Sequence, residues 1–306
     1  MKLQFLFQPL GHADRSAYNE IYHRHVETIV ENLPKDWEII FNPEPQKGFL
    51  TVSLHVGIKG DIFMSHGLAD KNWRNADVMG EFGDVCVSGR AMRHKLLFQG
   101  MDPKKLHTIG YPFLDKTFEA KAAGRFQELG NLIAWCPTHH HSPSTGPHLG
   151  PRIEPKLENN MFDEPWKFVS AIHPYHLASK KTTQELICQS SVVIGDTGSS
   201  VYEAWALGKP VVFAPFALKI GGEAVTNIVQ RWKGSLEAQI YFNGVGRHAD
   251  DLYGVEWLCH HAMENGITDE EVAFIDRVFQ PELRGCSGEY AADIFVQIAR
   301  RRGMYA

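Results

Sequence analysis

The sequence predicts an α/β protein made of two Rossmann-like domains in tandem, each with a parallel β-sheet. Short apolar segments of strand length alternate with segments of helical periodicity along the chain, an alternation typical of parallel sheets. The length of 306 residues suits two domains, at roughly 150 residues for each. The composition, 43% hydrophobic and 22% charged, is that of a globular protein and excludes disorder, collagen and coiled coil.

The first half of the chain opens on a strand-like segment, LQFLFQPL, followed by a helix expected over residues 16–33. Tyr22, Val26, Ile29 and Leu33 share one face of that helix. Further strands are expected at 37–41 and within LTVSLHVGI, DIFMSHG and DVCVSGR. The segment GYPFLDKTFEAKAAGRFQELG then predicts a turn and a polar helix, after which we place the domain boundary.

The second half repeats the pattern, with strands expected in NLIAWC, KFVSAIHP, SSVVIG and KPVVFAPF. The tail GEYAADIFVQIARRRG predicts a terminal helix with Ala291, Ile294, Phe295 and Ile298 on one side. Its basic end, 300–302, is expected to be solvated. The predicted divisions are an N-terminal domain over 1–122, a C-terminal domain over 123–285, and a terminal helix over 286–306 that packs back on the body.

Charge and cysteine content narrow the function classes. The net charge of −5 gives no general attraction to nucleic acid or anionic lipid. The five cysteines are widely spaced without a C-x-x-C pair, so neither a disulfide framework nor a cysteine zinc site is indicated. No signal peptide and no apolar run of about 20 residues is found. We therefore expect a cytoplasmic protein without a transmembrane segment.

The most informative segment is SSVVIGDTGSSVYEAWALGKPVVFAP, residues 190–215. It predicts a buried strand, a small polar turn, a helix over 201–207 and a further strand over 210–213. A turn after a strand of a parallel sheet lies at the carboxyl edge, where ligands bind, and a helix N-terminus favours anions. We expect the turn to bind a donor phosphate, with five candidate residues: Asp196, Thr197, Gly198, Ser199 and Ser200.

Glu203 stands one helical turn after Ser200, so its carboxylate can accept hydrogen bonds from vicinal hydroxyls such as those of a ribose. A purely structural alternative stays open, in which Asp196, Thr197 and Ser199 cap the helix and Glu203 completes a capping box. Together with LGKP and the next buried strand, however, the segment resembles the nucleotide-diphosphate-binding segment of GT-B transferases. The G-x-S-x-x-E pattern of that segment stands here as Gly198, Ser200 and Glu203.

A narrower resemblance comes from short motifs in one order. They are HG at 66–67, SG at 88–89, GYP at 110–112, PT at 137–138, HP at 173–174, GDTGSSVYEAWALGKPVVF and the terminal CSGEYAADIFVQIARR. This order resembles the CDP-glycerol glycerophosphotransferase family of teichoic-acid polymerases and primases, over roughly residues 60–300. The resemblance implies a GT-B fold, with two Rossmann-like domains facing a central cleft. It makes 1–122 the acceptor side and 123–285 the nucleotide-donor domain.

Two departures affect the donor. The family turn usually reads T-D-Y-S-S, whereas this chain has GDTGSS at 195–200, and the PT motif leads into His139–His141 where the family has an aromatic residue and an arginine. The substrate donor implied is therefore a nucleotide-activated compound, either CDP-glycerol or a UDP- or GDP-sugar. No bound cofactor is expected. No amphipathic membrane-docking helix stands out, which leaves only peripheral contact with the inner face of the membrane open.

Two strand-end histidines are the catalytic candidates. His66 follows the apolar DIFMS, and an imidazole there could take the proton of an acceptor hydroxyl, which contributes about 10²–10⁴-fold to a rate. The resemblance assigns His66 that role of general base. His173 follows KFVSAI and, by the same resemblance, lies near the donor phosphates, where it would stabilise the charge that grows on the leaving group. A structural role is the alternative for each.

The remaining polar clusters are weaker candidates. Neighbouring side chains of the His139–His141 run point in different directions in an extended loop, so no metal is expected there. Thr138, with one of these histidines, is expected to contact donor phosphate. Asp70, Lys71 and Arg74 are expected to form an exposed charged loop, with contact to an anionic acceptor as the alternative.

The sequence thus predicts a GT-B-type transferase that moves a glycerol-phosphate or glycosyl group from a nucleotide-activated donor to a hydroxyl acceptor, which a polymer could carry. Three alternatives stay open: an isomerase similar to UDP-GlcNAc 2-epimerase, a DNA-modifying glycosyltransferase, and a nucleotide-binding module without catalysis. The net charge makes duplex binding depend on a focused patch.

Overall fold

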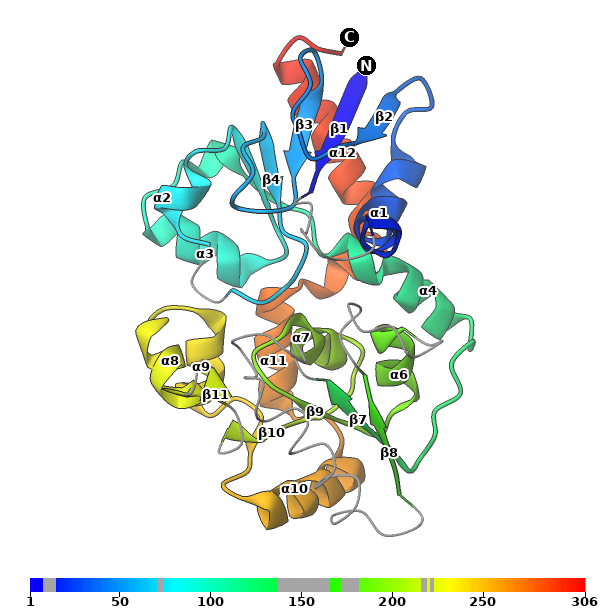
Figure 1. The fold of residues 1–306 in the computed structure, drawn as a ribbon, viewed down its shortest axis with the longest axis vertical. Helices are drawn as coiled ribbons and strands as arrows, with labels where there is room; N and C mark the ends of the chain where they lie inside the picture. The colour runs from blue at the N-terminus through cyan, green and yellow to red at the C-terminus, as the bar shows by residue number, and fades with distance from the viewer. Residues whose placement is uncertain are drawn as a thin grey trace. The chain divides into compact units, whose positions relative to one another are not determined.

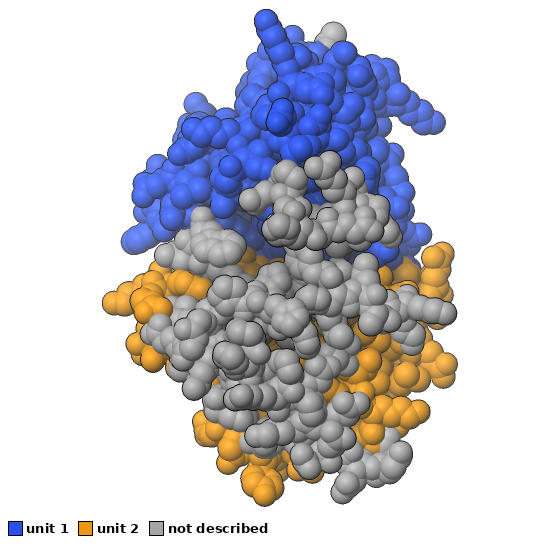
Figure 2. Space-filling view, viewed as in Figure 1, with its two compact units in different colours: residues 1–68, 73–119, 276–306 blue, residues 69–72, 120–275 orange. Residues whose placement is uncertain are grey.

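A computed structural model of the chain describes residues 1–7, 15–70, 74–136, 166–171, 182–215, 219–220 and 223–305. Two compact units are distinguished (Figure 2). Unit 1 consists of 1–68, 73–119 and 276–306, and unit 2 consists of 69–72 and 120–275. The chain passes into unit 2 at 120, where the sequence placed a boundary after 122, and it returns to unit 1 at 276, ahead of the expected terminal segment.

Unit 1 is built on a parallel sheet with the strand order β2-β1-β3-β4-β5-β6 (Figure 1). The strands β3, β4 and β5 are buried along their whole length, as expected where helices cover both faces of a parallel sheet. That burial explains why their sequences are continuous apolar runs. The strands are β1 (Lys2–Leu6), β2 (Glu38–Phe41), β3 (Leu50–Ser53), β4 (Ile62–Met64), β5 (Asp84–Val87) and β6 (Leu106–Thr108).

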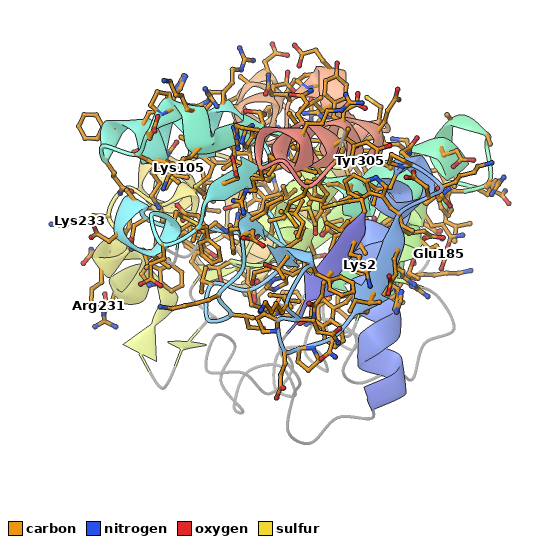
Figure 3. All side chains as sticks on the ribbon, turned by 90° about the horizontal axis from the view of Figure 1, so that it is seen from above. Lys2, Lys105, Glu185, Arg231, Lys233 and Tyr305 are labelled. Carbon is orange, nitrogen blue, oxygen red and sulfur yellow. The ribbon has the colours of Figure 1, made fainter. Side chains whose placement is uncertain are left out.

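The first and last helices of the chain pack together in unit 1. Helix α1 (Arg15–Asn32) confirms the expected helix, and α12 (Ser287–Arg301) confirms the terminal one. On α12, Ala291, Phe295 and Ile298 are buried in the same core as the α1 residues Val26 and Ile29. The other helices that begin in unit 1 are α2 (Ala76–Met79), α3 (Arg90–Phe98), η1 (Pro103–Lys105), η2 (Pro112–Leu114), α4 (Asp115–Ala122) and η5 (Pro281–Leu283). After α12, Tyr305, labelled in Figure 3, contacts Trp37 edge to face.

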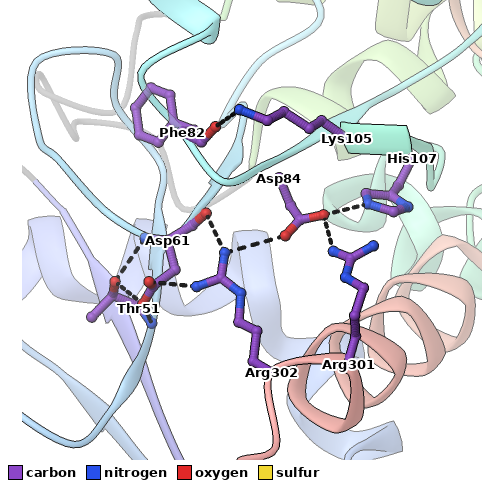
Figure 4. Close-up of polar contacts among 8 residues, drawn as sticks. All are labelled: Thr51, Asp61, Phe82, Asp84, Lys105, His107, Arg301 and Arg302. Atoms are coloured by element: carbon purple, nitrogen blue, oxygen red, sulfur yellow. Dashed lines mark hydrogen bonds and ion pairs between the residues drawn. The ribbon is translucent and has the colours of Figure 1, made fainter. Parts of the chain in front are cut away.

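The basic end of α12 forms ion pairs (Figure 4). The Arg301 side chain is 52% exposed, as expected for a solvated end, whereas that of Arg302 is only 27% exposed, which corrects the expectation for Arg302. The carboxylate of Asp84, 1% exposed at the start of β5, accepts hydrogen bonds from Arg301, from Arg302 (3.2 Å) and from His107 (2.8 Å). Arg302 also binds Asp61 at 2.6 Å. Burial alone would raise the pKa of Asp84, but the hydrogen bonds from His107 and Arg301 outweigh it and lower that pKa to about 2.

Unit 2 is built on a second parallel sheet, with the order β13-β10-β9-β7-β8. The strands are β7 (Leu132–Cys136), β8 (Lys167–Ser170), β9 (Val192–Gly195), β10 (Val211–Phe213) and β13 (Arg247–His248). A short antiparallel pair also occurs, β11 (Lys219–Ile220) with β12 (Glu223–Ala224). The helices are α6 (Thr183–Gln189), α7 (Ser199–Ala206), α8 (Val225–Arg231), α9 (Leu236–Asn243), α10 (Leu252–Asn265) and α11 (Asp269–Val278), whose last residues enter unit 1.

The α/β class and the two parallel sheets confirm the fold predicted from the sequence. Within the residues described, no helix has the length and apolar character needed to cross a membrane.

Candidate functional site

Each sheet contains a point at which the order of the strands reverses. In unit 2, β8 lies on one side of β7 and β9 lies on the other, so the crossovers after β7 and β9 run in opposite directions. In unit 1, β2 and β3 flank β1 in the same way. Ligands of open parallel sheets bind outside the carboxyl ends of the strands at such reversals. The turn after β9 and the loop after β3 therefore occupy the two expected positions.

The turn after β9 leads into a helix whose N-terminus has no side-chain cap. The N-cap residue is Gly198, in an extended conformation, and its amide donates to Asp196 Oδ1 at 2.9 Å. The preceding Gly195 is needed for the close return of the chain, because a Cβ there would lie 2.6 Å from Cγ2 of Val201. The helix α7 thus begins directly at the strand end, with no side chain capping its N-terminus.

The three hydroxyls of this turn differ in their contacts. Ser200 Oγ donates to the carbonyl of Cys136 at 3.3 Å, which joins the ends of β7 and β9 across the reversal. Ser199 Oγ accepts from the amide of Ala69 at 3.4 Å. Thr197 is 2% exposed, and its hydroxyl has no hydrogen-bond partner among the described residues. A buried hydroxyl without a partner costs about 1–3 kcal/mol, so an unused donor here is unusual.

The capping alternative does not hold for this turn. Glu203 is 3% exposed, and its Oε2 accepts a hydrogen bond from Gln184 Nε2 of α6 at 2.8 Å. The N-cap position belongs to Gly198, which cannot provide a side-chain cap, so no capping box forms at α7. The carboxylates of Asp196 and Glu203 also lie near Cys136, where together with burial they raise the pKa of its thiol. These two charges oppose an anion at the turn, whereas the helix N-terminus favours one.

A buried polar network lies behind the turn. Glu237 Oε1 accepts hydrogen bonds from Tyr202 Oη of α7 (2.7 Å) and from the amide of Asp70 (2.9 Å). The Asp70 carboxylate accepts in turn from the amide of Leu236 at the start of α9, at 3.3 Å. Asp70 is 1% exposed, so the expectation of an exposed charged loop was wrong for this residue.

A second orphan hydroxyl belongs to the same unit. The Tyr241 hydroxyl on α9 is buried without a partner among the described residues. Burial, together with the charges of Asp196 and Glu237, raises the pKa of Tyr241, so the group stays a phenol.

In unit 1, His66 lies just after the end of β4 and is exposed. Its Nδ1 lies 2.7 Å from the carbonyl oxygen of Leu54. A carbonyl can only accept, so Nδ1 carries the hydrogen and Nε2 is the basic nitrogen of the neutral ring. The backbone of the loop is fixed as well, because Tyr111 Oη donates to the His66 carbonyl at 3.3 Å.

His66 belongs to a cluster of aromatic and imidazole rings, which we call the histidine cluster: Tyr22, His25, His55 and His66. The rings of His55 and His66 lie 4.3 Å apart between centroids with a tilt of 32°, and those of His25 and His66 lie 6.1 Å apart, edge to face. Tyr22 Oη lies 2.5 Å from His55 Nε2. Burial, and to a lesser extent His66, lowers the pKa of His55 to about 3; burial likewise lowers that of His25.

The described structure includes only part of the predicted site. The turn residues and Glu203 follow one another at β9 and α7, and His66 lies at a strand end as expected. Thr138, His139–His141 and His173 lie outside the described residues. Within the described part of the chain, no group of three or more His, Cys, Asp or Glu side chains is arranged to hold a metal ion.

The sequence did not identify Tyr22, His25 or His55 as neighbours of His66. A signal for His55 was present, because SLH at the end of β3 repeats the strand-then-histidine pattern of MSH at the end of β4.

Comparison with known proteins shows the fold. No family model matches the sequence, and no curated protein matches it. Among solved structures, a CDPG-soaked variant of the wall teichoic acid polymerase TagF has a TM-score of 0.57 at 13% identity, covering 98% of this chain and 89% of that one. The UDP-GlcNAc 2-epimerase of Methanocaldococcus jannaschii, in complex with UDP-GlcNAc and UDP, has a TM-score of 0.55 at 12% identity, covering 97% and 100%. The fold is GT-B.

Proposed function

We propose that this protein is a GT-B-type transferase that moves a glycerol-phosphate or glycosyl group from a nucleotide-activated donor to a hydroxyl acceptor. The donor phosphates bind at the turn of residues 196–200, and His66 acts as the general base. The observation that carries the proposal is the N-terminus of α7, which stands uncapped at the strand reversal of unit 2 beside the unpartnered hydroxyl of Thr197. The positive end of the helix dipole and a buried hydroxyl donor both suit the oxygens of a phosphate.

The chemistry needs one proton acceptor and one anion site. Nε2 of His66 takes the proton of the acceptor hydroxyl as its oxygen attacks, and the ring becomes an imidazolium held by Leu54. Attack at phosphorus breaks the pyrophosphate bond and transfers glycerol phosphate; attack at an anomeric carbon breaks the C–O bond and transfers a sugar. In both cases the bonding electrons leave with the nucleotide, whose phosphate gains charge at the N-terminus of α7.

The segment after His66 leads from unit 1 into unit 2. Ala69, three residues after His66, belongs to unit 2, and its amide donates to Ser199 in the first turn of α7. The segment that follows the proposed base thus includes a residue, Ala69, that contacts the first turn of α7.

The remaining roles follow the family resemblance. Thr138 and His173 are proposed donor-phosphate contacts, and Glu203, already oriented by Gln184, is the proposed ribose contact. The similar structures support a nucleotide-linked substrate, because one was soaked with CDPG and the other is in complex with UDP-GlcNAc and UDP. The proposed setting is the cytoplasm, with a hydroxyl acceptor that a polymer could carry.

A ligand screen with a matched variant tests the donor site. CDP-glycerol, CDP-ribitol and common UDP- and GDP-sugars are added in a thermal unfolding assay, where a ligand at 100 times its dissociation constant adds about 2.7 kcal/mol. Thr197→Val removes the buried hydroxyl while keeping the shape of the side chain. We expect this variant to be at least as stable as the wild type without ligand, because an unpartnered hydroxyl is lost.

The same variant should bind the donor about 10–100-fold more weakly, the effect of one hydrogen bond to a charged group. Thr108→Val, on β6 of unit 1, should leave binding unchanged. Absence of a shift with every nucleotide donor would overturn the proposal, as would undiminished donor binding by Thr197→Val. Conversion of UDP-GlcNAc to UDP-ManNAc by the wild type would replace the transferase with an isomerase on the same fold.

A further inference from the structure

The loop after β3 brings a second histidine to the strand reversal of unit 1. His55 lies two residues after the end of β3, one of the two strands that meet at that reversal. The strand β4, which precedes His66, is the next strand of the sheet. The two histidines share one short stretch of backbone, since the carbonyl that fixes the His66 ring belongs to Leu54, the neighbour of His55. Any movement of the His55 loop therefore moves the partner of His66 Nδ1.

The ring of His55 is itself fixed. Tyr22 Oη of α1 lies 2.5 Å from His55 Nε2, and the Tyr22 ring stacks on Phe7 at 5.3 Å. The amide of His55 donates to Ser53 Oγ at 3.3 Å, and Ser53 Oγ donates to the His55 carbonyl at 2.7 Å. Both the ring and the backbone of His55 are thus held in one orientation.

In this arrangement the imidazoles of His55 and His66 do not transfer a proton directly to one another. Their centroids are 4.3 Å apart with a tilt of only 32°, so the rings lie face toward face, whereas a hydrogen bond would need a ring nitrogen directed at the other ring in its plane. A face-to-face neighbour limits rotation of the His66 ring. It also offers a neutral π-surface to the imidazolium that forms when His66 takes a proton.

Groups on other elements complete the surroundings of His66. His25 of α1 lies 6.1 Å away, edge to face, and is itself stacked on Phe113 at 4.1 Å. Tyr111 holds the His66 carbonyl, and Arg74 donates to the carbonyl of Gly67 at 2.5 Å. Burial keeps Tyr22 a neutral phenol and His55 a neutral imidazole at physiological pH, so neither places a charge against the ring of His66.

We propose that His55, held by Tyr22, is a positioning residue that keeps the His66 ring in the Nδ1–H tautomer, in which Nε2 is the basic nitrogen. The proposal rests on the proposed function for its catalytic meaning, but the tautomer itself can be measured in the protein without substrate. Sequence gave no reason to connect Tyr22 with His66, because the two are brought together only by the packing of α1 beside the strand ends.

The experiment is nitrogen-15 NMR of histidine-labelled full-length protein, with the wild type, Tyr22→Phe and His55→Phe. Tyr22→Phe keeps the stacked ring and removes only the hydroxyl; His55→Phe keeps a ring against His66 and removes the partner of Tyr22. Tyr290→Phe and His94→Phe make the same chemical changes at exposed positions. We expect one Nδ1–H tautomer for His66 in the wild type and both controls, and a mixture of tautomers in Tyr22→Phe and His55→Phe.

Turnover provides the second measurement once a donor is found. In Tyr22→Phe, kcat should fall by about 10–100-fold, the range expected when a catalytic group is misplaced, while the KM for the donor stays within about twofold. A fold change of KM alone, or an unchanged single tautomer in both cluster variants, would overturn the positioning role. Failure of the proposed function has a different signature: no turnover by the wild type, although His66 keeps its single tautomer.

Discussion

The histidine cluster should make unit 1 sensitive to mild acid. His25 is buried and His55 is half-buried, and neither forms an ion pair with a described residue. Desolvation lowers the pKa of both below the ordinary value of 6.5, in the case of His55 to about 3. Unfolding returns both rings to water, where they take up protons below pH 6.5. The perturbation is therefore acidification from pH 8 to pH 5, combined with replacement of His55.

The direction and size of the change in folding stability with pH follow from proton linkage. Between pH 6.5 and about 3 the unfolded chain binds one more proton at His55 than the folded protein, so stability is complete above pH 6.5 and falls as the pH falls. One pKa unit corresponds to about 1.4 kcal/mol, and pH 5 is roughly 1.5 units below the unfolded value. His55 alone should therefore remove about 2 kcal/mol at pH 5 relative to pH 8, and His25 adds a loss of the same sign.

Urea unfolding at pH 8, 6.5 and 5, followed by far-ultraviolet circular dichroism, measures this slope. His55→Asn will also lose packing, so the observable is the change of stability with pH and not the stability at one pH. We expect the loss between pH 8 and 5 to be about 2 kcal/mol smaller in His55→Asn than in the wild type. His94→Asn, at an exposed position of α3, should keep the wild-type slope. Equal slopes in the wild type and His55→Asn would show that His55 does not take up a proton on unfolding in this pH range.

Three further variants test the packing that holds each unit together. Asp84→Asn removes the 1% exposed carboxylate that binds the two arginines at the C-terminal end of α12, and it should lower the free energy of unfolding in urea by about 3 kcal/mol. Asp61→Asn, at a half-exposed position, should lower it by less. Equal losses would show that burial of the Asp84 carboxylate does not strengthen its ion pairs. Glu271→Gln breaks a fully buried ion pair with the arginine of β13 and should lower the free energy of unfolding by about 3–5 kcal/mol. The exposed Glu270→Gln on the same helix should lower it by less than about 0.5 kcal/mol. A small loss in Glu271→Gln would show that the ion pair is dispensable. Gly195→Ala should both lower the melting temperature and weaken donor binding, because its Cβ would displace the first turn of α7. Normal donor binding by a destabilised Gly195→Ala variant would show that the donor does not bind at this turn.

The fold was predictable because its signal is local. Parallel strands buried on both faces require unbroken apolar runs, and the runs that became β3, β5, β7 and β9 could be read directly from the chain. The strand order could not be read, because it depends on pairing between segments far apart in the sequence. The association of α12 with α1 is of the same kind, since the amphipathic tail fits either unit by its pattern alone.

In the candidate site, too, the features that are local in the sequence were predictable and those formed by distant segments were not. The turn 196–200 was predictable because strand, turn and helix follow one another in the sequence. The environment of His66 was not, because Tyr22 and His25 come from a helix about 40 residues earlier. Burial of Asp70 was also unpredictable, since aspartate is ordinarily exposed and this one is stabilised by the amide at the start of α9.

A crystal structure of the protein with a hydrolysis-resistant nucleotide-diphosphate donor would show directly whether the donor phosphate binds at the turn of residues 196–200. We expect phosphate oxygens at about 2.7–3.2 Å from the Thr197 hydroxyl and from the first amides of α7. A nucleotide bound elsewhere, with the Thr197 hydroxyl still lacking a partner, would contradict this expectation.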